Sequence, residues 1–215
     1  MSKAFREKFA QQHEFLEASI HYLQLAIKYS QEYGNTAWVA KSEELLKKIN
    51  TLYVGSKSRD YSIRISQIKV MLGIDADAST DTVIDVLRLN EEDIEEPAQV
   101  RNLKTEQIEG MISILTQFRR ELGKGGFRAK AKEEGKVLRE EAEPLLKQAN
   151  ILLLGLMYYY YFRRRGDAAV GMEDENEYKL LSKDLERFII TARRYKMLTL
   201  SVKAGKLLEQ VAYVG

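Results

Sequence analysis

The sequence predicts an all-α protein, an irregular bundle of about six to eight helices that begins with a helical hairpin. Two observations lead to this prediction, and a third limits the kinds of site that the chain can hold. Apolar residues recur at spacings of three, four and seven over most of the 215 residues, which is the period of an amphipathic helix. Pro occurs only at Pro97 and Pro144, whereas strands joined by tight turns need more turn residues. The chain has no Cys, so disulfides and thiolate metal sites are excluded.

The first two elements are predicted to form the hairpin. A long helix over residues 3–33 ends at Gly34-Asn35, and Thr36 can cap a second helix over 37–54, which Gly55 ends. The inner face of the first helix is expected to contain Phe5, Phe9, Leu16, Ile20, Leu23 and Ile27. The inner face of the second is expected to contain Trp38, Leu45, Leu46, Ile49 and Tyr53.

The middle of the chain is predicted to hold short elements. Residues 56–60 read as a polar linker, and a helix is favoured over 61–74, although alternating apolar residues there leave a short strand open. A turn follows, after which Ser79 or Thr80 caps a short helix that runs to about Leu89. Residues 90–103 are acidic and are expected to form a loop.

The second half is predicted to contain the longest helices. One runs from Thr105 to Leu122, and a hinge at residues 123–126 (Gly-Lys-Gly-Gly) separates it from a helix over 127–164 that Pro144 kinks. That helix ends at residues 165–167, and a loop over 167–174 leads to a last helix towards Val211, bent near Gly205. The run from Ile151 to Phe162 has no charge, which predicts a helix buried on all sides.

The expected domain organisation follows these elements. Residues 1–56 form an N-terminal hairpin, residues 57–103 a connecting region of short helices, and residues 104–215 a C-terminal bundle, unless the whole chain is one domain. Charge is divided unevenly: residues 1–100 carry 12 Lys and Arg against 16 Asp and Glu, and residues 101–215 carry 22 against 16. The C-terminal half is therefore the expected side for an anionic partner.

Basic residues in that half give the favoured functional prediction. They follow a helical spacing around the glycine hinge and form two further clusters, so they could track a phosphate backbone. The candidate nucleic-acid-binding residues are Arg119, Arg120, Lys124, Arg128, Lys132, Lys136, Arg139, Arg163, Arg164, Arg165, Arg193 and Arg194. We therefore expect a non-enzymatic helical subunit of a nucleoprotein assembly that contacts the backbone of RNA or DNA without reading sequence. Lys–Glu pairs at i,i+4 in the same region would equally suit a solvated helix surface.

Two other interpretations remain open. The chain could be a protein–protein adaptor or structural oligomer, with a Tyr-rich helical interface at residues 158–161 and no nucleic acid. It could also bind a metal through His13, Glu17 and His21, which lie at i, i+4 and i+8 on one side of a helix. No other His occurs in the chain, so no second ligand pair is available and the favoured interpretation has no cofactor.

Other functional classes lack support in the sequence. No Ser-His-Asp set, nucleophile elbow, kinase-like set or phosphate-binding loop motif is present, so we expect no enzyme. The N-terminus shows no signal peptide, and the uncharged run is too short to span a bilayer. A cytoplasmic protein with no membrane partner is expected, one that binds other subunits or itself.

Overall fold

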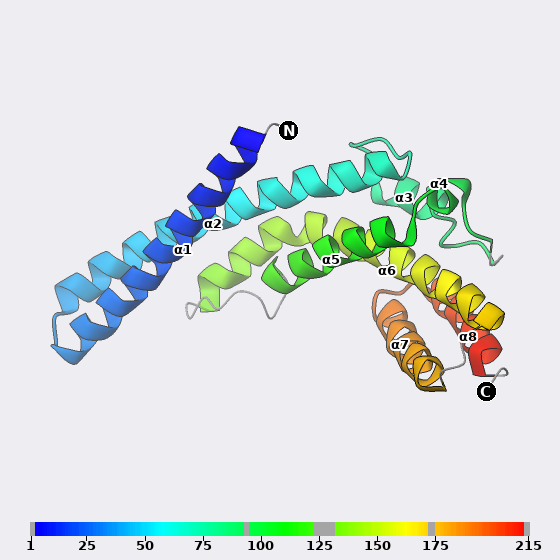
Figure 1. The fold of residues 1–215 in the computed structure, drawn as a ribbon. Helices are drawn as coiled ribbons and strands as arrows, with labels where there is room; N and C mark the ends of the chain where they lie inside the picture. Colours follow the sequence, from blue (N-terminus) through cyan, green and yellow to red (C-terminus); the bar gives the residue numbers. More distant parts are fainter. Residues whose placement is uncertain (1–2, 93–94, 123–131, 172–174, 213–215) are drawn as a thin grey trace. The chain divides into compact units, whose positions relative to one another are not determined.

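The computed structural model describes residues 3–92, 95–122, 132–171 and 175–212, and confirms the all-α prediction (Figure 1). Side chains are described over residues 11–92, 95–121, 142–165 and 178–211. These residues contain eight helices and no strand. The helices are α1 (Lys3–Glu32), α2 (Thr36–Met71), α3 (Thr80–Val86), α4 (Ala98–Arg101), α5 (Thr105–Leu122), α6 (Lys132–Gly171), α7 (Glu175–Arg194) and α8 (Leu198–Ala212).

The chain divides into two compact units. Met1–Ile63 and Leu122–Glu143 form the first, here called the hairpin unit, and Arg64–Glu121 and Pro144–Gly215 form the second, the core unit. Helices α2 and α6 each contribute residues to both units. Within the hairpin unit, α1 runs antiparallel beside the first part of α2 (Figure 1).

The second helix is longer than predicted. The prediction that it ends at Gly55 and is followed by a linker was wrong, because α2 continues without a break to Met71. The helix favoured over residues 61–74 is confirmed as the last part of α2. A glycine inside a helix costs about 1 kcal/mol. Contacts that Ser56 and Lys57 make with α1 hold the helix together beyond that glycine.

The short elements follow the predicted signals with shifted ends. Ser79 caps α3, and its Oγ accepts a hydrogen bond from the Thr82 N–H at 3.1 Å. The helix ends at Val86, before the predicted Leu89, and Arg88 adopts a positive φ of 50°. The predicted acidic loop contains α4, which begins directly after its N-cap residue Pro97.

The long C-terminal helices differ from prediction mainly at their ends. Helix α5 has the predicted bounds, whereas α6 continues past the predicted end at residues 165–167 to Gly171. The single last helix was predicted wrongly, since α7 and α8 are separated at residues 195–197, where Lys196 has a φ of 60°. Gly205, the predicted bend, lies inside α8. The predicted hinge at residues 123–126 lies outside the described residues.

The uncharged run in α6 forms the centre of the core unit, as predicted. Its leucines and three of its four tyrosines are buried, and Tyr158 and Tyr159 are completely inaccessible to solvent. Phe188 of α7 packs against this helix, with ring centroids 6.4 Å from Tyr158 and 6.0 Å from Tyr161. Helices α7 and α8 pack against each other.

One glycine allows a close approach in this core. A Cβ atom at Gly155 would lie 2.9 Å from Leu87 Cδ1 and 3.2 Å from Leu89 Cδ2. Both leucines are fully buried, so the segment after α3 packs directly onto the α6 backbone.

Candidate functional site

A small polar network fixes how α1 and α2 pair. His13 Nε2 and Ser56 Oγ are 2.8 Å apart, and the Tyr53 hydroxyl donates to Glu17 Oε1 at 2.8 Å. Lys57 Nζ lies 3.8 Å from the same Glu17 oxygen. Partial burial, followed by the nearby Lys57 ammonium, lowers the pKa of His13, so its imidazole is neutral near pH 7.

This network uses two of the three candidate metal ligands. His13 and Glu17 are bonded to α2 side chains, while His21 is exposed and stacks edge-on against Tyr22, with ring centroids 5.8 Å apart. Over the ranges with described side chains, no three His, Cys, Asp or Glu residues lie in a group that could hold a metal ion. The geometry therefore assigns His13 and Glu17 to helix pairing.

The inner faces of the hairpin agree with prediction only in part. Leu16 is buried, and Ile20, Leu23 and Ile27 are half-buried, as are Leu46, Ile49 and Tyr53 of α2. Trp38 and Leu45 were predicted wrongly, because they are 57% and 43% exposed. Each lies one position before a residue of the pairing face and so points to the side of the hairpin. The side chains of Phe5 and Phe9 lie outside the described residues.

Trp38 and Leu45 belong to a larger set of exposed apolar side chains that we call the apolar face. Each helix contributes one row in which residues recur mainly every seven positions, which keeps them on one side of a helix. The apolar face consists of Phe15, Tyr22, Tyr29 and Tyr33 of α1 with Trp38, Leu45 and Leu52 of α2.

Both rows lie on the same side of the hairpin. In α1, Phe15 and Tyr22 directly precede Leu16 and Leu23, which face α2. In α2, Leu45 likewise directly precedes Leu46, which faces α1. One residue back along a helix is a rotation of about 100°. Because the two helices are antiparallel, the same rotation turns both rows towards one side.

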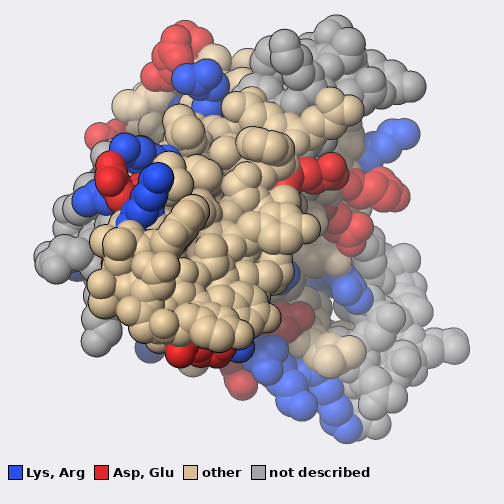
Figure 2. Space-filling model, turned by 90° about the vertical axis from the view of Figure 1, so that its left-hand side faces the viewer, with Lys and Arg blue, Asp and Glu red and all other residues tan. Residues whose placement is uncertain are grey.

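The apolar face carries no charged residue. Among the described side chains, the residues between each row and the pairing face are also uncharged, as at Ser19, Ala26 and Ser42. The molecule in Figure 2 is viewed from the side on which the α1–α2 turn lies in Figure 1, and much of that surface is uncharged with acidic and basic side chains at its edges. Lysine ammonium groups lie over two rings of the face, Lys28 over Tyr29 and Lys41 over Trp38, at 5.9 and 5.6 Å from the ring centroids.

The predicted nucleic-acid-binding residues are only partly described. Arg119 and Arg120 are exposed in the last turn of α5, and Arg193 and Arg194 are exposed in the last turn of α7. Basic side chains at these positions also stabilise the helix ends through the dipole. Of the remaining predicted residues, Lys124 and Arg128 lie outside the described residues, as do the side chains of Lys132, Lys136 and Arg139.

Arg163 requires a correction, because its guanidinium is bonded inside the core unit. Its Nε donates to Glu96 Oε1 at 2.8 Å, and its two Nη atoms donate to the carbonyls of Leu103 and Val100, each at 2.6 Å. The side chain is only 16% exposed. Arg163 therefore holds the segment around α4 to α6 and does not face a phosphate backbone.

The other two arginines of this cluster are also partly enclosed. Arg165 donates a hydrogen bond to Gln210 of α8, and its guanidinium carbon lies 5.6 Å from the Phe162 ring centroid. Arg164 is half-buried. The three neighbouring arginines therefore do not form one exposed basic patch.

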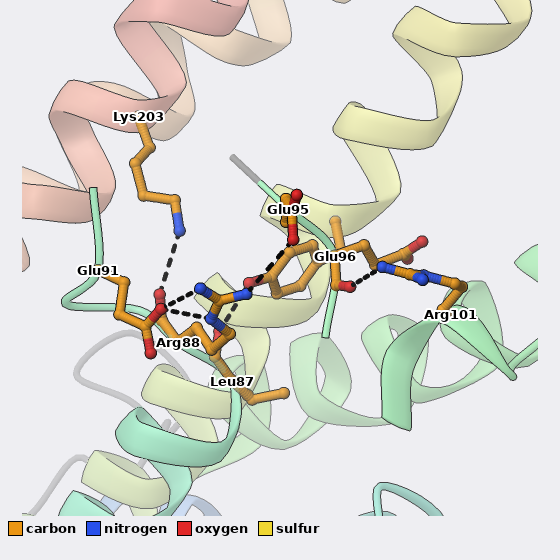
Figure 3. A network of polar contacts seen from close by, with 8 residues as sticks. Leu87, Arg88, Glu91, Glu95, Glu96, Arg101 and Lys203 are labelled. Atoms are coloured by element: carbon orange, nitrogen blue, oxygen red, sulfur yellow. Dashed lines mark hydrogen bonds and ion pairs between the residues drawn. The ribbon is translucent and has the colours of Figure 1, made fainter. Parts of the chain in front are cut away.

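A second polar network holds the irregular segment between α3 and α4 (Figure 3). Lys203 Nζ donates to the Arg88 carbonyl at 3.1 Å, and the Tyr159 hydroxyl donates to the Leu87 carbonyl at 2.7 Å. The Arg88 side chain turns towards Glu91 and Glu95. The backbone here forms few helical hydrogen bonds, so buried side chains supply partners for its carbonyls.

Buried lysines were not anticipated from the sequence. Lys203 is 1% exposed, and its Nζ atom lies over the face of the Tyr158 ring, 5.2 Å from the ring centroid. Lys69 is 2% exposed and donates to the carbonyls of Ala76 and Ala78 at 3.2 and 2.8 Å. Burial lowers the pKa of Lys69, an effect that nearby carboxylates oppose. No local sequence signal marks either lysine, because each bonds to a loop whose position depends on the tertiary fold.

The three buried phenols of α6 are protonated near neutral pH. Burial raises the pKa of Tyr158 and Tyr159 strongly and that of Tyr161 to about 12. The Tyr158 hydroxyl has no hydrogen-bond partner among the described residues, whereas that of Tyr159 is bonded. The predicted Tyr-rich interface is therefore internal, since three of its four side chains are buried.

Among the helices within the described ranges, none combines the length and hydropathy needed to cross a bilayer. Comparisons with protein families, with curated proteins and with solved structures gave no match to this chain.

Proposed function

We propose that this protein is a non-enzymatic assembly subunit whose hairpin unit binds another protein through the apolar face. The observation that supports the proposal is the exposure of seven large apolar side chains on one uncharged side of the hairpin. Tyr33 is 85% exposed and Tyr22 is 69% exposed. Contiguous apolar patches above a few hundred Å² on a protein surface mark interaction sites.

The composition of the apolar face suits a protein interface better than other partners. Five of its seven residues are Phe, Tyr or Trp, the types enriched at the centres of protein interfaces. A phosphate backbone would require cations at the centre of the contact, and here they lie only at its margin. The altered pKa values of the described residues belong to groups held in helix pairing, loop capping, a surface ion pair or the buried centre of α6.

A second candidate function is contact with a nucleic-acid backbone through the core unit. It is favoured by two exposed arginine pairs at helix ends, Arg119-Arg120 and Arg193-Arg194. Binding of single-stranded RNA and duplex DNA across a salt series tests it. Affinity should fall linearly with salt on logarithmic axes, and Arg119→Glu with Arg120→Glu should reduce the slope. Absence of binding at low salt would eliminate this candidate.

Site-specific photo-crosslinking in expressing cells tests the proposed protein interface. A photoreactive phenylalanine analogue is placed at Tyr22 or Leu45 of the full chain. The matched controls are Gln24 and Thr51, which are exposed on the opposite side of the same helices. We expect discrete crosslinked products from positions 22 and 45 alone. Equal patterns at all four positions, or no product at any, would refute the proposal.

A further inference from the structure

We infer that the partner of the apolar face is a second copy of this chain, and that two hairpins pair face to face into a four-helix bundle. This inference rests on the proposed function and specifies its partner. Three properties of the described residues carry it: the size of the face, its heptad spacing and the charges at its two edges.

The apolar face has the size that a stable dimer needs. Its five aromatic side chains are 52–85% exposed, and its two leucines are 43% and 62% exposed. At about 150–250 Å² per aromatic side chain, the face presents roughly 800 Å² of surface. Two copies would bury about 1,600 Å² together, which is the standard size of a specific interface.

The spacing of the face suits another pair of helices. Phe15, Tyr22 and Tyr29 repeat every seven residues along α1, and Trp38, Leu45 and Leu52 repeat every seven along α2. A seven-residue apolar repeat is the pattern by which helices pack side by side in coiled coils and bundles. The surface between two antiparallel helices is also self-complementary, as a two-fold interface requires.

The two edges of the face have opposite net charge, because acidic residues outnumber Lys28 on the edge of α1 and basic residues outnumber Glu44 on the edge of α2. On the outer edge of α2, Lys41 and Lys48 each follow a residue of the apolar row by three positions, and Arg59 follows Leu52 by seven positions, at the end of that row. On the outer edge of α1, Glu32 follows Tyr29 by three positions, and Glu14 lies one position before Phe15. In the isolated chain, the ion pairs of these edges are intrahelical and largely exposed, Lys28–Glu32 and Glu44–Lys48, so they contribute little.

Two hairpins can stack face to face with α1 over α1 or with α1 over α2 of the partner, and these charges favour the second arrangement. A two-fold axis parallel to the helices places α1 of each copy over α2 of its partner, and the acidic edge then meets the basic edge. The His13–Ser56 contact sets the height of each residue along the hairpin. At that register, Glu32 lies within about one helical turn of Lys41 of the partner subunit, and Glu14 within about one turn of Arg59 of the partner subunit. All neighbouring helices are antiparallel in this arrangement.

Sedimentation equilibrium of the full chain tests the inference. We expect a dimer of the 24.8 kDa chain. Tyr22→Glu with Leu45→Glu should raise its dissociation constant by roughly 100-fold or more. The control, Gln24→Glu with Thr51→Glu, adds the same charge on the opposite side and should leave the dimer intact. Circular dichroism checks that helix content is unchanged, which we expect because the altered side chains are already exposed.

A charge exchange tests the stacking. Glu32→Lys and Lys41→Glu should each weaken the dimer, and the two together should restore it. A chain that stays monomeric at about 100 μM, well above a micromolar dissociation constant, overturns the inference. Crosslinks from positions 22 and 45 to another protein would then leave the proposed function standing. A dimer that is insensitive to Tyr22→Glu with Leu45→Glu overturns the inference, since the chains then meet elsewhere.

Discussion

The hairpin unit and the core unit place their aromatic side chains in opposite environments. In the core unit, Tyr158, Tyr159 and Phe188 are at most 1% exposed. In the hairpin unit, Tyr22 and Trp38 are more than half exposed. Both sets lie on long helices, so aromatic content alone does not determine burial. The difference arises because other helices of the core unit enclose the centre of α6, whereas the exposed aromatic side chains of α1 and α2 lie beside the faces that these two helices turn to each other.

The units also differ in how much apolar surface they bury. Among the described side chains of residues 1–63, only Leu16, Val54 and Tyr61 are buried hydrophobic residues. The core unit buries most of its leucines and also encloses two lysines, each bonded to backbone carbonyls. Association that covers the exposed apolar side chains of residues 1–63 would stabilise the hairpin, because removing apolar surface from water is favourable.

Arg163→Ala should have the largest effect on the core unit. It removes one partner of an enclosed ion pair and leaves Glu96 and two carbonyls without their donor, at a cost of about 3–5 kcal/mol. Denaturant unfolding and hydrogen exchange of residues 96–103 measure it. The control Arg120→Ala, at an exposed site, should change stability by less than about 0.5 kcal/mol. Similar losses in both variants would show that Arg163 is not a structural residue.

Tyr159→Phe and Tyr158→Phe should change the stability of the core unit differently, although the two residues are neighbours. The first deprives the buried Leu87 carbonyl of its donor, and a loss of about 1–3 kcal/mol is expected. The second removes a buried hydroxyl that has no partner among the described residues, so stability should stay the same or rise. Thermal or denaturant unfolding of each variant gives the comparison. An equal loss would mean that the Tyr158 hydroxyl does have a partner.

Glycine-to-alanine substitutions test how closely each unit is packed around a helix, because each adds a single methyl group. At Gly155 the added methyl meets two fully buried leucines, and the loss should be about 1 kcal/mol even after the gain in helix propensity. At Gly55 nothing lies within 4 Å of the added methyl, so about 0.5–1 kcal/mol of stability should be gained. Both changes in stability can be measured by hydrogen exchange of the backbone amides, followed separately for the two units. A loss of stability in Gly55→Ala would show that this side of α2 is covered.

Two residues of the apolar face were assigned to the inside of the hairpin from the sequence, and the other five were not assigned. The seven-residue spacing of Phe15, Tyr22 and Tyr29 is as regular as that of the true pairing residues. The periodicity shows which residues share a side of a helix, but it does not show which side meets a neighbour. Trp38 and Leu45 were therefore expected inside the hairpin and lie outside it. The exposed rows could have been recognised as a second apolar stripe beside the first.

The sequence by itself determined the helical class, a helix cap at Ser79 or Thr80, the bounds of α5 and the burial of the uncharged run in α6. These features depend on local signals: helical periodicity, a capping side chain and a run without charge. Only the tertiary structure decided that α2 continues through Gly55, that Arg163 faces Glu96, and that Lys69 and Lys203 are enclosed. Each of these depends on a partner supplied by a distant helix or loop, and the position of that partner is set by packing rather than by neighbouring residues.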